Sequence, residues 1–214
     1  MDLNRWNQIR YGFYAPVYDL AGRLFTRSRR KAIQSLGLRP GQKVLLIGAG
    51  TGLDLEWMPK NVNLTAIDLA LPMLNRTKAR MLRLGLQGSV MRMDGQQMTF
   101  ADQTFDAVIL HLVVTVVPDP VQLLREAVRV LKPQGKISVF DVLVPRNKKI
   151  NWVRRLAHIP VNFFFSVMTC QFEKLEAQVD EIILIEDSPA EFWGQYRRIL
   201  LEKKDESAID QLLS

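Results

Sequence analysis

A run of branched apolar residues meets three alternating glycines in the stretch Val44-Leu45-Leu46-Ile47-Gly48-Ala49-Gly50-Thr51-Gly52. Four apolar residues in a row are typical of a strand that is buried on both faces of a parallel sheet. Glycines directly after such a strand let the chain turn sharply and let a ligand lie against bare backbone. The stretch therefore predicts a nucleotide-type binding corner at the end of a buried strand.

Outward from this corner the pattern alternates strands and helices. Strands are expected at residues 43–47, 63–68, 89–93, 105–112 and 136–142, and helices at residues 53–58, 72–84 and 120–131. A turn is expected at residues 132–135 and a mainly helical connection at residues 146–177. Residues 182–186 and 196–202 are expected to close the sheet as a hairpin-like pair. Repeated βα units predict an α/β fold, a doubly wound, mostly parallel seven-stranded sheet in one domain over residues 1–214.

The amino-acid composition argues against disulfide-bonded, metal-binding and membrane-spanning proteins. Of the 214 residues, 48% are hydrophobic and 24% charged, which is ordinary for a globular domain. One cysteine, Cys170, allows no internal disulfide, and the two histidines, His111 and His158, have no metal-site spacing. The longest apolar run, residues 159–170, is interrupted by proline and asparagine and is too short to span a bilayer. We expect a cytoplasmic protein without a metal, associated peripherally with a membrane.

The positive charge lies at the N-terminus. Residues 1–43 carry nine Lys and Arg against two acids, and the rest of the chain sums to zero, so the whole net charge of +7 lies in this extension. Residues 1–37 are predicted helical, with a break at Pro16 and an end at Gly37, and basic residues alternate with Trp, Tyr and Phe. Such a helix suits an anionic membrane surface, or a lid packed on its own domain. We therefore assign residues 1–40 as a helical lid or membrane-contact extension.

The spacing of the glycines separates the classes of nucleotide site. A dinucleotide fingerprint is Gly-x-Gly-x-x-Gly, whereas here the third glycine comes one residue early and Leu53 takes the fingerprint position. A P-loop is excluded because no Gly-Lys-Ser/Thr follows. The spacing resembles motif I of the class I S-adenosylmethionine-dependent methyltransferases. Phe105-Asp106-Ala107-Val108 and Leu131-Lys132-Pro133-Gln134-Gly135 are also similar to that family, and the resemblance covers nearly the whole chain.

The resemblance implies S-adenosyl-L-methionine as cofactor and a set of residues around it. Asp68 would accept the ribose hydroxyls at the end of the second strand, and Asp94 would bind the adenine amino group at the end of the third. Other implied cofactor-binding residues lie in the corner or next to these acids: Gly48, Ala49, Gly50, Thr51, Gly52, Leu69, Met73 and Gly95. Tyr14 and Tyr18 of the N-terminal extension and His111 at the end of the fourth strand complete the set. One position departs from the family: Leu46 stands where an acid is usual, which leaves open a degenerate relative that binds the cofactor poorly.

Two segments bear on the methyl acceptor. Tyr14-Ala15-Pro16-Val17-Tyr18-Asp19 is similar to a lid segment of bacterial phosphatidylethanolamine N-methyltransferases and of ubiquinone/menaquinone C-methyltransferases. Residues 111–120 resemble the strand exit of the phospholipid enzymes. We therefore expect stepwise methylation of phosphatidylethanolamine to phosphatidylcholine at an anionic membrane, with a prenyl quinone or other small molecule as the alternative. Nucleic acid is not expected, because no Asn/Asp-Pro-Pro-Tyr/Phe motif follows the fourth strand.

Methyl transfer needs chiefly alignment of the acceptor with the methyl group. A protonated amine must first lose a proton, so a polar side chain is expected near the methyl group. The candidate catalytic residues are Tyr18, His111 and Asp141, of which His111 has the best placement because it ends the strand beside the crevice. A structural hydrogen bond from His111 to the lid is the competing interpretation. The oligomeric state is not predicted by any pattern in the chain.

Overall fold

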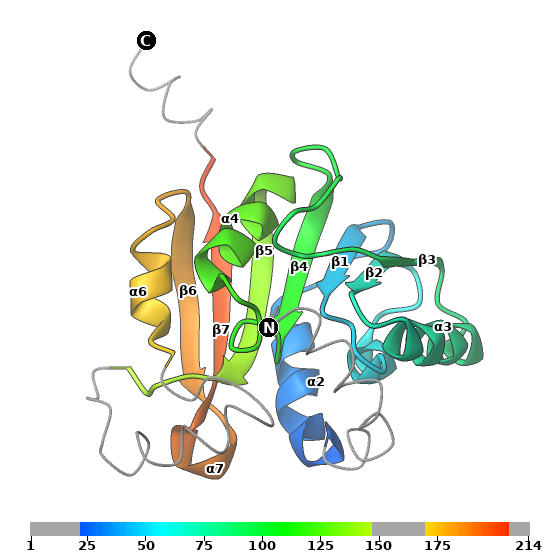
Figure 1. Ribbon diagram of the computed structural model, residues 1–214, viewed down its shortest axis with the longest axis horizontal. Coiled ribbons are helices and arrows are strands. Elements are labelled where there is room, and N and C mark those ends of the chain that lie inside the picture. The colour runs from blue at the N-terminus through cyan, green and yellow to red at the C-terminus, as the bar shows by residue number, and fades with distance from the viewer. Residues whose placement is uncertain (1–21, 147–169, 206–214) are drawn as a thin grey trace.

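The computed structural model describes residues 22–146 and 170–205, and its centre is one seven-stranded sheet (Figure 1). The strand order is β3-β2-β1-β4-β5-β7-β6. The strands are β1 (Lys43–Ile47), β2 (Asn63–Asp68), β3 (Gly88–Arg92), β4 (Phe105–His111), β5 (Leu131–Val142), β6 (Ile182–Pro189) and β7 (Tyr196–Lys203). This confirms the predicted α/β class and the seven strands.

The pairing of the strands locates the site. β1 pairs in parallel with β2 on one side and with β4 on the other. The connections therefore reverse direction at β1 and β4, and ligands of open α/β sheets bind outside the carboxyl ends of the strands at such a switch point. β7 lies antiparallel between β5 and β6, as predicted for the closing pair. The glycine corner follows β1 and so lies at this switch point.

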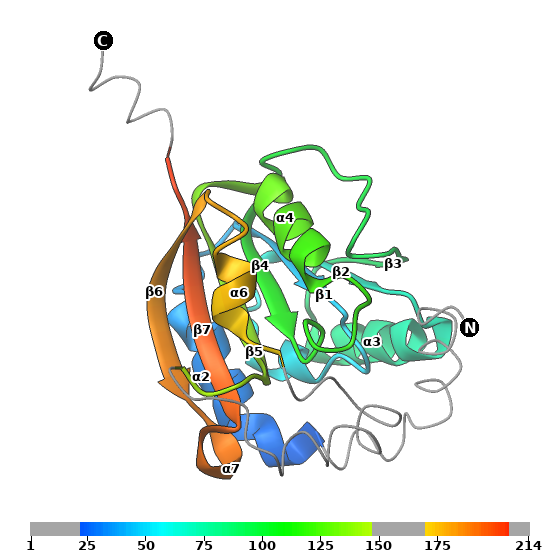
Figure 2. The ribbon, with the colours of Figure 1, turned by 60° about the vertical axis from the view of Figure 1, so that its left-hand side comes forward.

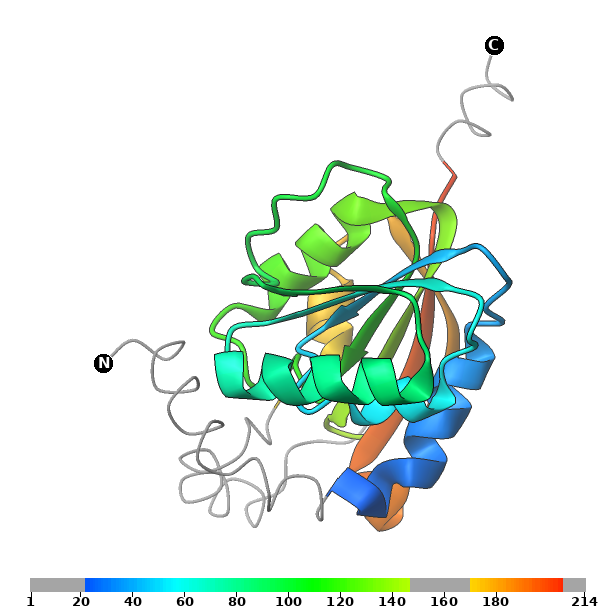
Figure 3. The same ribbon diagram turned by 90° about the vertical axis from the view of Figure 1, so that its right-hand side faces the viewer.

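Helices cover both faces of the sheet, as Figure 3 shows edge-on. One face carries α2 (Thr26–Ser35), α3 (Leu71–Leu84) and the 3-10 helix η2 (Leu53–Trp57). The other carries α4 (Pro120–Val130) and α6 (Phe172–Glu176), which pack side by side (Figure 2). The hydrophobic core divides accordingly, with Leu123 and Phe172 in the cluster under α4 and α6, and Ile33 and Leu46 in the cluster under α2.

The residues at the ends of α3 and α4 are those that commonly begin and end helices. α3 has Pro72 in its first turn and ends at Gly85, whose φ of 65° is a left-handed cap that favours glycine. α4 has Pro120 at its start and Asp119 as its N-cap, which accepts a hydrogen bond from the Gln122 amide at 2.9 Å. The two predicted helices therefore form within one residue of their expected bounds.

Two expectations need correction. The predicted turn at residues 132–135 is instead part of β5, which begins at Leu131 and accommodates a positive φ of 60° at Gln134 and a register shift against β4. The predicted helix at residues 53–58 is a 3-10 helix. The remaining short elements are η1 (Arg23–Phe25) and α7 (Glu191–Gly194). The predicted connection at residues 146–177 lies largely outside the described residues.

The described part of the N-terminal extension packs on the sheet. In α2, Ala32 and Ile33 are buried, and the helix contacts β5, β7 and η2. The Ser28 hydroxyl also donates to Glu191 of α7 at 2.5 Å. In the ranges 22–146 and 170–205, no helix has the length and apolarity required to cross a membrane. Tyr14 and Tyr18 lie outside the described residues.

Candidate cofactor site

The glycine corner is a left-handed loop that hydrogen bonds hold on both sides. Gly48, Gly50 and Gly52 have φ of 67°, 55° and 78°. The Ala49 amide donates to the Ile67 carbonyl of β2 at 3.0 Å, and the Gly52 amide donates back to Ala49 at 2.8 Å. Residues with a side chain rarely adopt such φ values, so the alternating glycines allow the turn to form.

Each glycine faces a different environment. A Cβ atom at Gly48 would come within 2.6 Å of Val113, and one at Gly52 within 3.0–3.2 Å of Leu55 and Thr77. At Gly50 the nearest atom of residues 22–146 and 170–205 is the Gly48 carbonyl oxygen, at 4.0 Å. Within this described part of the chain, the corner therefore leaves open backbone at Gly50, where a ligand can lie against the chain. This arrangement fits S-adenosylmethionine.

Asp68 fixes the middle of this loop from the end of β2. One of its carboxylate oxygens accepts from the Gly50 amide at 2.8 Å, and the other accepts from the Ala70 amide at 2.9 Å. Thr77 of α3 donates to the Gly50 carbonyl at 2.7 Å. Burial raises the pKa of the Asp68 carboxyl, against the lowering effect of its backbone hydrogen bonds. Asp68 can thus order the loop and still present unused lone pairs to a ribose.

Replacing Asp68 with asparagine should weaken S-adenosylmethionine binding about tenfold to a hundredfold, the equivalent of one lost charge-assisted hydrogen bond. The amide can satisfy only one of the two backbone donors, and it removes the charge. Titration calorimetry would measure the change. The matched control is Asp106→Asn, because Asp106 binds the Lys43 amide and Lys132 near the amino ends of β1 and β4, whereas the corner lies at the carboxyl end of β1. Equal weakening in both variants would contradict the assigned role.

The other predicted cofactor residues lie either near the corner and the start of α3 or just after β3. Ala49, Thr51 and Met73 are buried at the corner and at the start of α3, and the half-buried Leu69 uses its carbonyl to accept from Arg92. The Asp94 carboxylate accepts from the amide and side chain of Gln96, which fits a turn at the end of β3.

Gly95 has a packing reason to be glycine. A Cβ atom there would come within 2.5 Å of Ile47 and 2.9 Å of Leu123. The absence of a side chain at Gly95 therefore allows the turn after β3 to pack closely against β1 and α4.

His111 is held on both sides of its ring. Its Nδ1 atom lies 2.7 Å from an Asp54 oxygen, and its Nε2 atom lies 3.0 Å from the Ser138 hydroxyl. The side chain is fully buried. Asp54 and Ser138 both bind α2 in turn, so His111 is connected to this helix through them, and both interpretations of His111 stay predictions.

Asp54 and Arg29 complete this buried chain, and neither was among the predicted site residues. The second Asp54 oxygen pairs with the Arg29 guanidinium, and both side chains are at most 5% exposed. Burial alone would raise the pKa of Asp54, but the charges of Arg29 and His111 and their hydrogen bonds lower it below its ordinary value.

Asp141 is buried near the end of β5. Its carboxylate accepts from the Thr115 hydroxyl at 2.6 Å, the Thr115 amide at 3.1 Å and the Val142 amide at 2.7 Å. Burial raises the pKa of this carboxyl in spite of these bonds. In the structure Asp141 holds the segment after β4.

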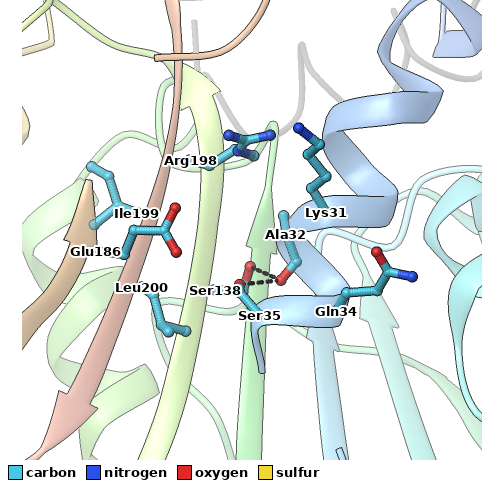
Figure 4. A pocket seen from close by; sticks show the side chains of 9 residues that line it. All are labelled: Lys31, Ala32, Gln34, Ser35, Ser138, Glu186, Arg198, Ile199 and Leu200. Atoms are coloured by element: carbon cyan, nitrogen blue, oxygen red, sulfur yellow. Dashed lines mark hydrogen bonds between the residues drawn. The ribbon is translucent and has the colours of Figure 1, made fainter. Parts of the chain in front are cut away.

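A cavity of about 250 Å³ lies between α2 and β7, apart from the glycine corner (Figure 4). Lys31 and Arg198 point toward one another across it, and Ser138 lies at its floor beside the Ala32 carbonyl. None of the predicted site residues lines it. Among residues 22–146 and 170–205, no group of three metal-ligating side chains occurs.

Comparison with known proteins identifies a matching domain family and two similar methyltransferases. Residues 45–139 match the methyltransferase domain family. The chain is 32% identical over 128 residues to phosphatidylethanolamine N-methyltransferase of Cereibacter sphaeroides, which covers 58% of this chain and 63% of that protein. It is 33% identical over 137 residues to demethylmenaquinone methyltransferase of Renibacterium salmoninarum, which covers 61% and 56%. The chain thus spans less than two thirds of the length of either relative.

Solved structures share the fold. An S-adenosylmethionine-dependent methyltransferase from Methanosarcina mazei superposes with a TM-score of 0.62 at 20% identity, over 78% of this chain and 94% of that one. The strand order, the glycine corner at the switch point and the domain match agree. Residues 45–139 therefore match a methyltransferase domain, and the chain shares its fold with an S-adenosylmethionine-dependent methyltransferase of known structure.

Proposed function

We propose that this methyltransferase adds methyl groups to the amine of phosphatidylethanolamine at an anionic membrane surface, yielding phosphatidylcholine through the mono- and dimethyl intermediates. The similarity to the Cereibacter phosphatidylethanolamine N-methyltransferase carries the proposal. The residues after β4, at positions 111–120, support it, because they resemble the strand exit of the phospholipid enzymes.

The charge of α2 adds support. Arg27, Arg30 and Lys31 are exposed on this helix, and Leu24 just before it is 66% exposed. Each cation near an anionic leaflet contributes about 1 kcal/mol of binding. Arg29 is not available for this purpose, because it is buried against Asp54. The exposed cations of α2 therefore support the proposal of reversible membrane contact.

The residues of the chain would act chiefly by positioning. Bound S-adenosylmethionine supplies an electrophilic methyl group on its sulfonium. Gly50 and Asp68 would hold the cofactor at the corner, and alignment with the acceptor amine would account for most of the rate. The proton-handling roles of Tyr18, His111 and Asp141 stay predictions, since Tyr18 lies outside the described residues and the other two have their polar atoms engaged.

A prenyl quinone is the second candidate acceptor. The demethylmenaquinone methyltransferase of Renibacterium is as similar to this chain as the phospholipid enzyme, at 33% identity. Such an enzyme would methylate a ring carbon and would not require anionic lipid. The two functions therefore differ in their dependence on a charged membrane.

Activity on phosphatidylethanolamine should require vesicles that contain phosphatidylglycerol, and it should fall as salt rises, because salt screens exposed charges. Removing two cations, as in R27Q/K31Q, should weaken vesicle binding roughly 30-fold at about 1 kcal/mol each. Cosedimentation with vesicles measures this binding. The control K60Q/K78Q removes equal charge from other exposed positions. Equal binding of both variants, or full activity without vesicles, would contradict the proposal.

A further inference from the structure

The unusual residue of the corner is Leu46, which stands where the family has an acid. Its side chain is 1% exposed and belongs to the apolar cluster that includes Ile33 of α2 and Leu36 just after that helix. In the sheet Leu46 lies opposite Ile109 of β4, so His111, two residues further along β4, projects from the same face. An acid at position 46 would therefore project into the space that β1, β4 and α2 enclose.

A different carboxylate lies near this region. Asp54 follows the last glycine of the corner by two residues, and it is 3% exposed. One oxygen accepts from His111 at the end of β4, at 2.7 Å, and the other pairs with Arg29 of α2. A single carboxylate thus joins the turn after the glycines, the exit of β4 and the helix packed over both.

The hydrogen bonds continue to a second point on α2. Ser138 of β5 lies 3.0 Å from His111 Nε2 and 3.0 Å from the Ala32 carbonyl, and Figure 4 shows Ser138 and Ser35 directed at that carbonyl. The Ser138 hydroxyl donates to the Ala32 carbonyl, and Arg29 pairs with Asp54. These two contacts connect α2 to the chain of side chains that begins at Asp54, just after the corner.

We propose that Arg29 and Asp54 are positioning residues for cofactor binding, which supply at this corner the buried charge that Leu46 does not. Arg29 holds Asp54, and Asp54, two residues after Gly52, holds the ring of His111. The geometry of Gly50 against the cofactor therefore depends on the docking of α2. A carboxylate on the turn, fixed by a helix from the N-terminal segment, replaces a carboxylate on the strand.

The protein contains a matched control for this idea. Arg197 of β7 is also buried, at 3% exposure, and also pairs with carboxylates, Asp187 and Glu173. It binds the Val144 carbonyl at 2.7 Å, on the other side of β5 from β1 and β4. Loss of either arginine removes a buried ion pair, but only Arg29 is connected to the glycine corner.

The test compares R29M and R197M by thermal unfolding and by calorimetric titration with S-adenosylmethionine and S-adenosylhomocysteine, at a temperature where circular dichroism shows both variants folded. Both should unfold at lower temperature than the parent protein. R29M should raise the Kd for both ligands at least tenfold, and R197M should leave it within twofold. R29K, which keeps the charge, should recover part of the affinity.

A second variant covers the case in which R29M does not fold. R29Q/D54N removes both charges with little change of shape and leaves no buried charge unpaired, so it should fold and still bind the cofactor at least tenfold more weakly. Cofactor affinity within twofold of the parent in R29M or R29Q/D54N, or equal weakening in R197M, would overturn the proposal. If the parent protein itself does not bind the cofactor, the proposed function fails first, and the two failures are distinguishable.

Discussion

Replacing Gly50 with valine should abolish measurable S-adenosylmethionine binding, with a loss of at least about a hundredfold. Gly50 has φ of 55°, and the backbone is fixed there by Asp68 on the amide and Thr77 on the carbonyl. A β-branched residue in the left-handed region costs about 1–3 kcal/mol. Its side chain would also fill the open space against which the cofactor lies. Calorimetric titration measures the loss.

Gly37→Val is the matched control for this prediction. Gly37 has φ of 61° and nothing within 4 Å of its Cβ position, so the backbone strain is nearly the same. It follows α2 and lies outside the corner. The control should lose a similar free energy of unfolding but bind the cofactor as the parent does. Normal binding by Gly50→Val would show that the cofactor does not lie against this loop.

Replacing Asp54 with alanine should destabilise the protein by about 3–5 kcal/mol, because Arg29 would be left as a buried charge without its partner. For a domain of this size that corresponds to a fall of roughly 6–20 °C in Tm. Scanning calorimetry and denaturant unfolding measure the change. The control is Asp102→Ala: its Arg129 partner also binds Glu126, and the Asp102 side chain is 70% exposed, so the cost should be at most about 1 kcal/mol.

The effect of Asp54 should depend on pH in a defined direction. Its pKa is lowered in the folded protein, so its contribution to stability is present above its ordinary value of 3.8 and is lost as pH falls through the folded pKa. The difference in unfolding free energy between the parent and Asp54→Ala should therefore be constant near neutrality and shrink in acid below pH 3.8. A difference that grows on acidification would contradict the ionised, paired state of Asp54.

The fold was predictable because its signals are local. Runs of apolar residues marked the buried strands, and glycine and proline marked the ends of α3, so most strand and helix bounds agree with the structure. The start of β5 was missed because the Lys-Pro-Gln-Gly sequence has the chemistry of a turn, whereas the strand already pairs with β4 at Leu131. Residues 132–135 keep a turn-like irregularity, with a positive φ at Gln134 and a register shift before the pairing resumes at Lys136.

The site was predictable in its backbone but not in its buried charges. The alternating glycines and the acid at the end of β2 indicate a ligand-binding corner directly from the sequence. The pairing of Arg29 with Asp54 depends on how α2 crosses the sheet, which no spacing in the sequence encodes. The nine cations of residues 1–43 likewise formed one group in the sequence, whereas the structure separates Arg29, held inside, from Arg27, Arg30 and Lys31 at the surface.

The identity of the methylated product tests the proposed function most directly. Protein incubated with methyl-labelled S-adenosylmethionine and vesicles of phosphatidylethanolamine and phosphatidylglycerol, with demethylmenaquinone added to the same vesicles, would offer both acceptors at once. Chromatography of the extracted lipids should show label in monomethyl- and dimethylphosphatidylethanolamine and in phosphatidylcholine. Label in the quinone alone, or no labelled lipid from protein that binds the cofactor, would contradict a phospholipid N-methyltransferase.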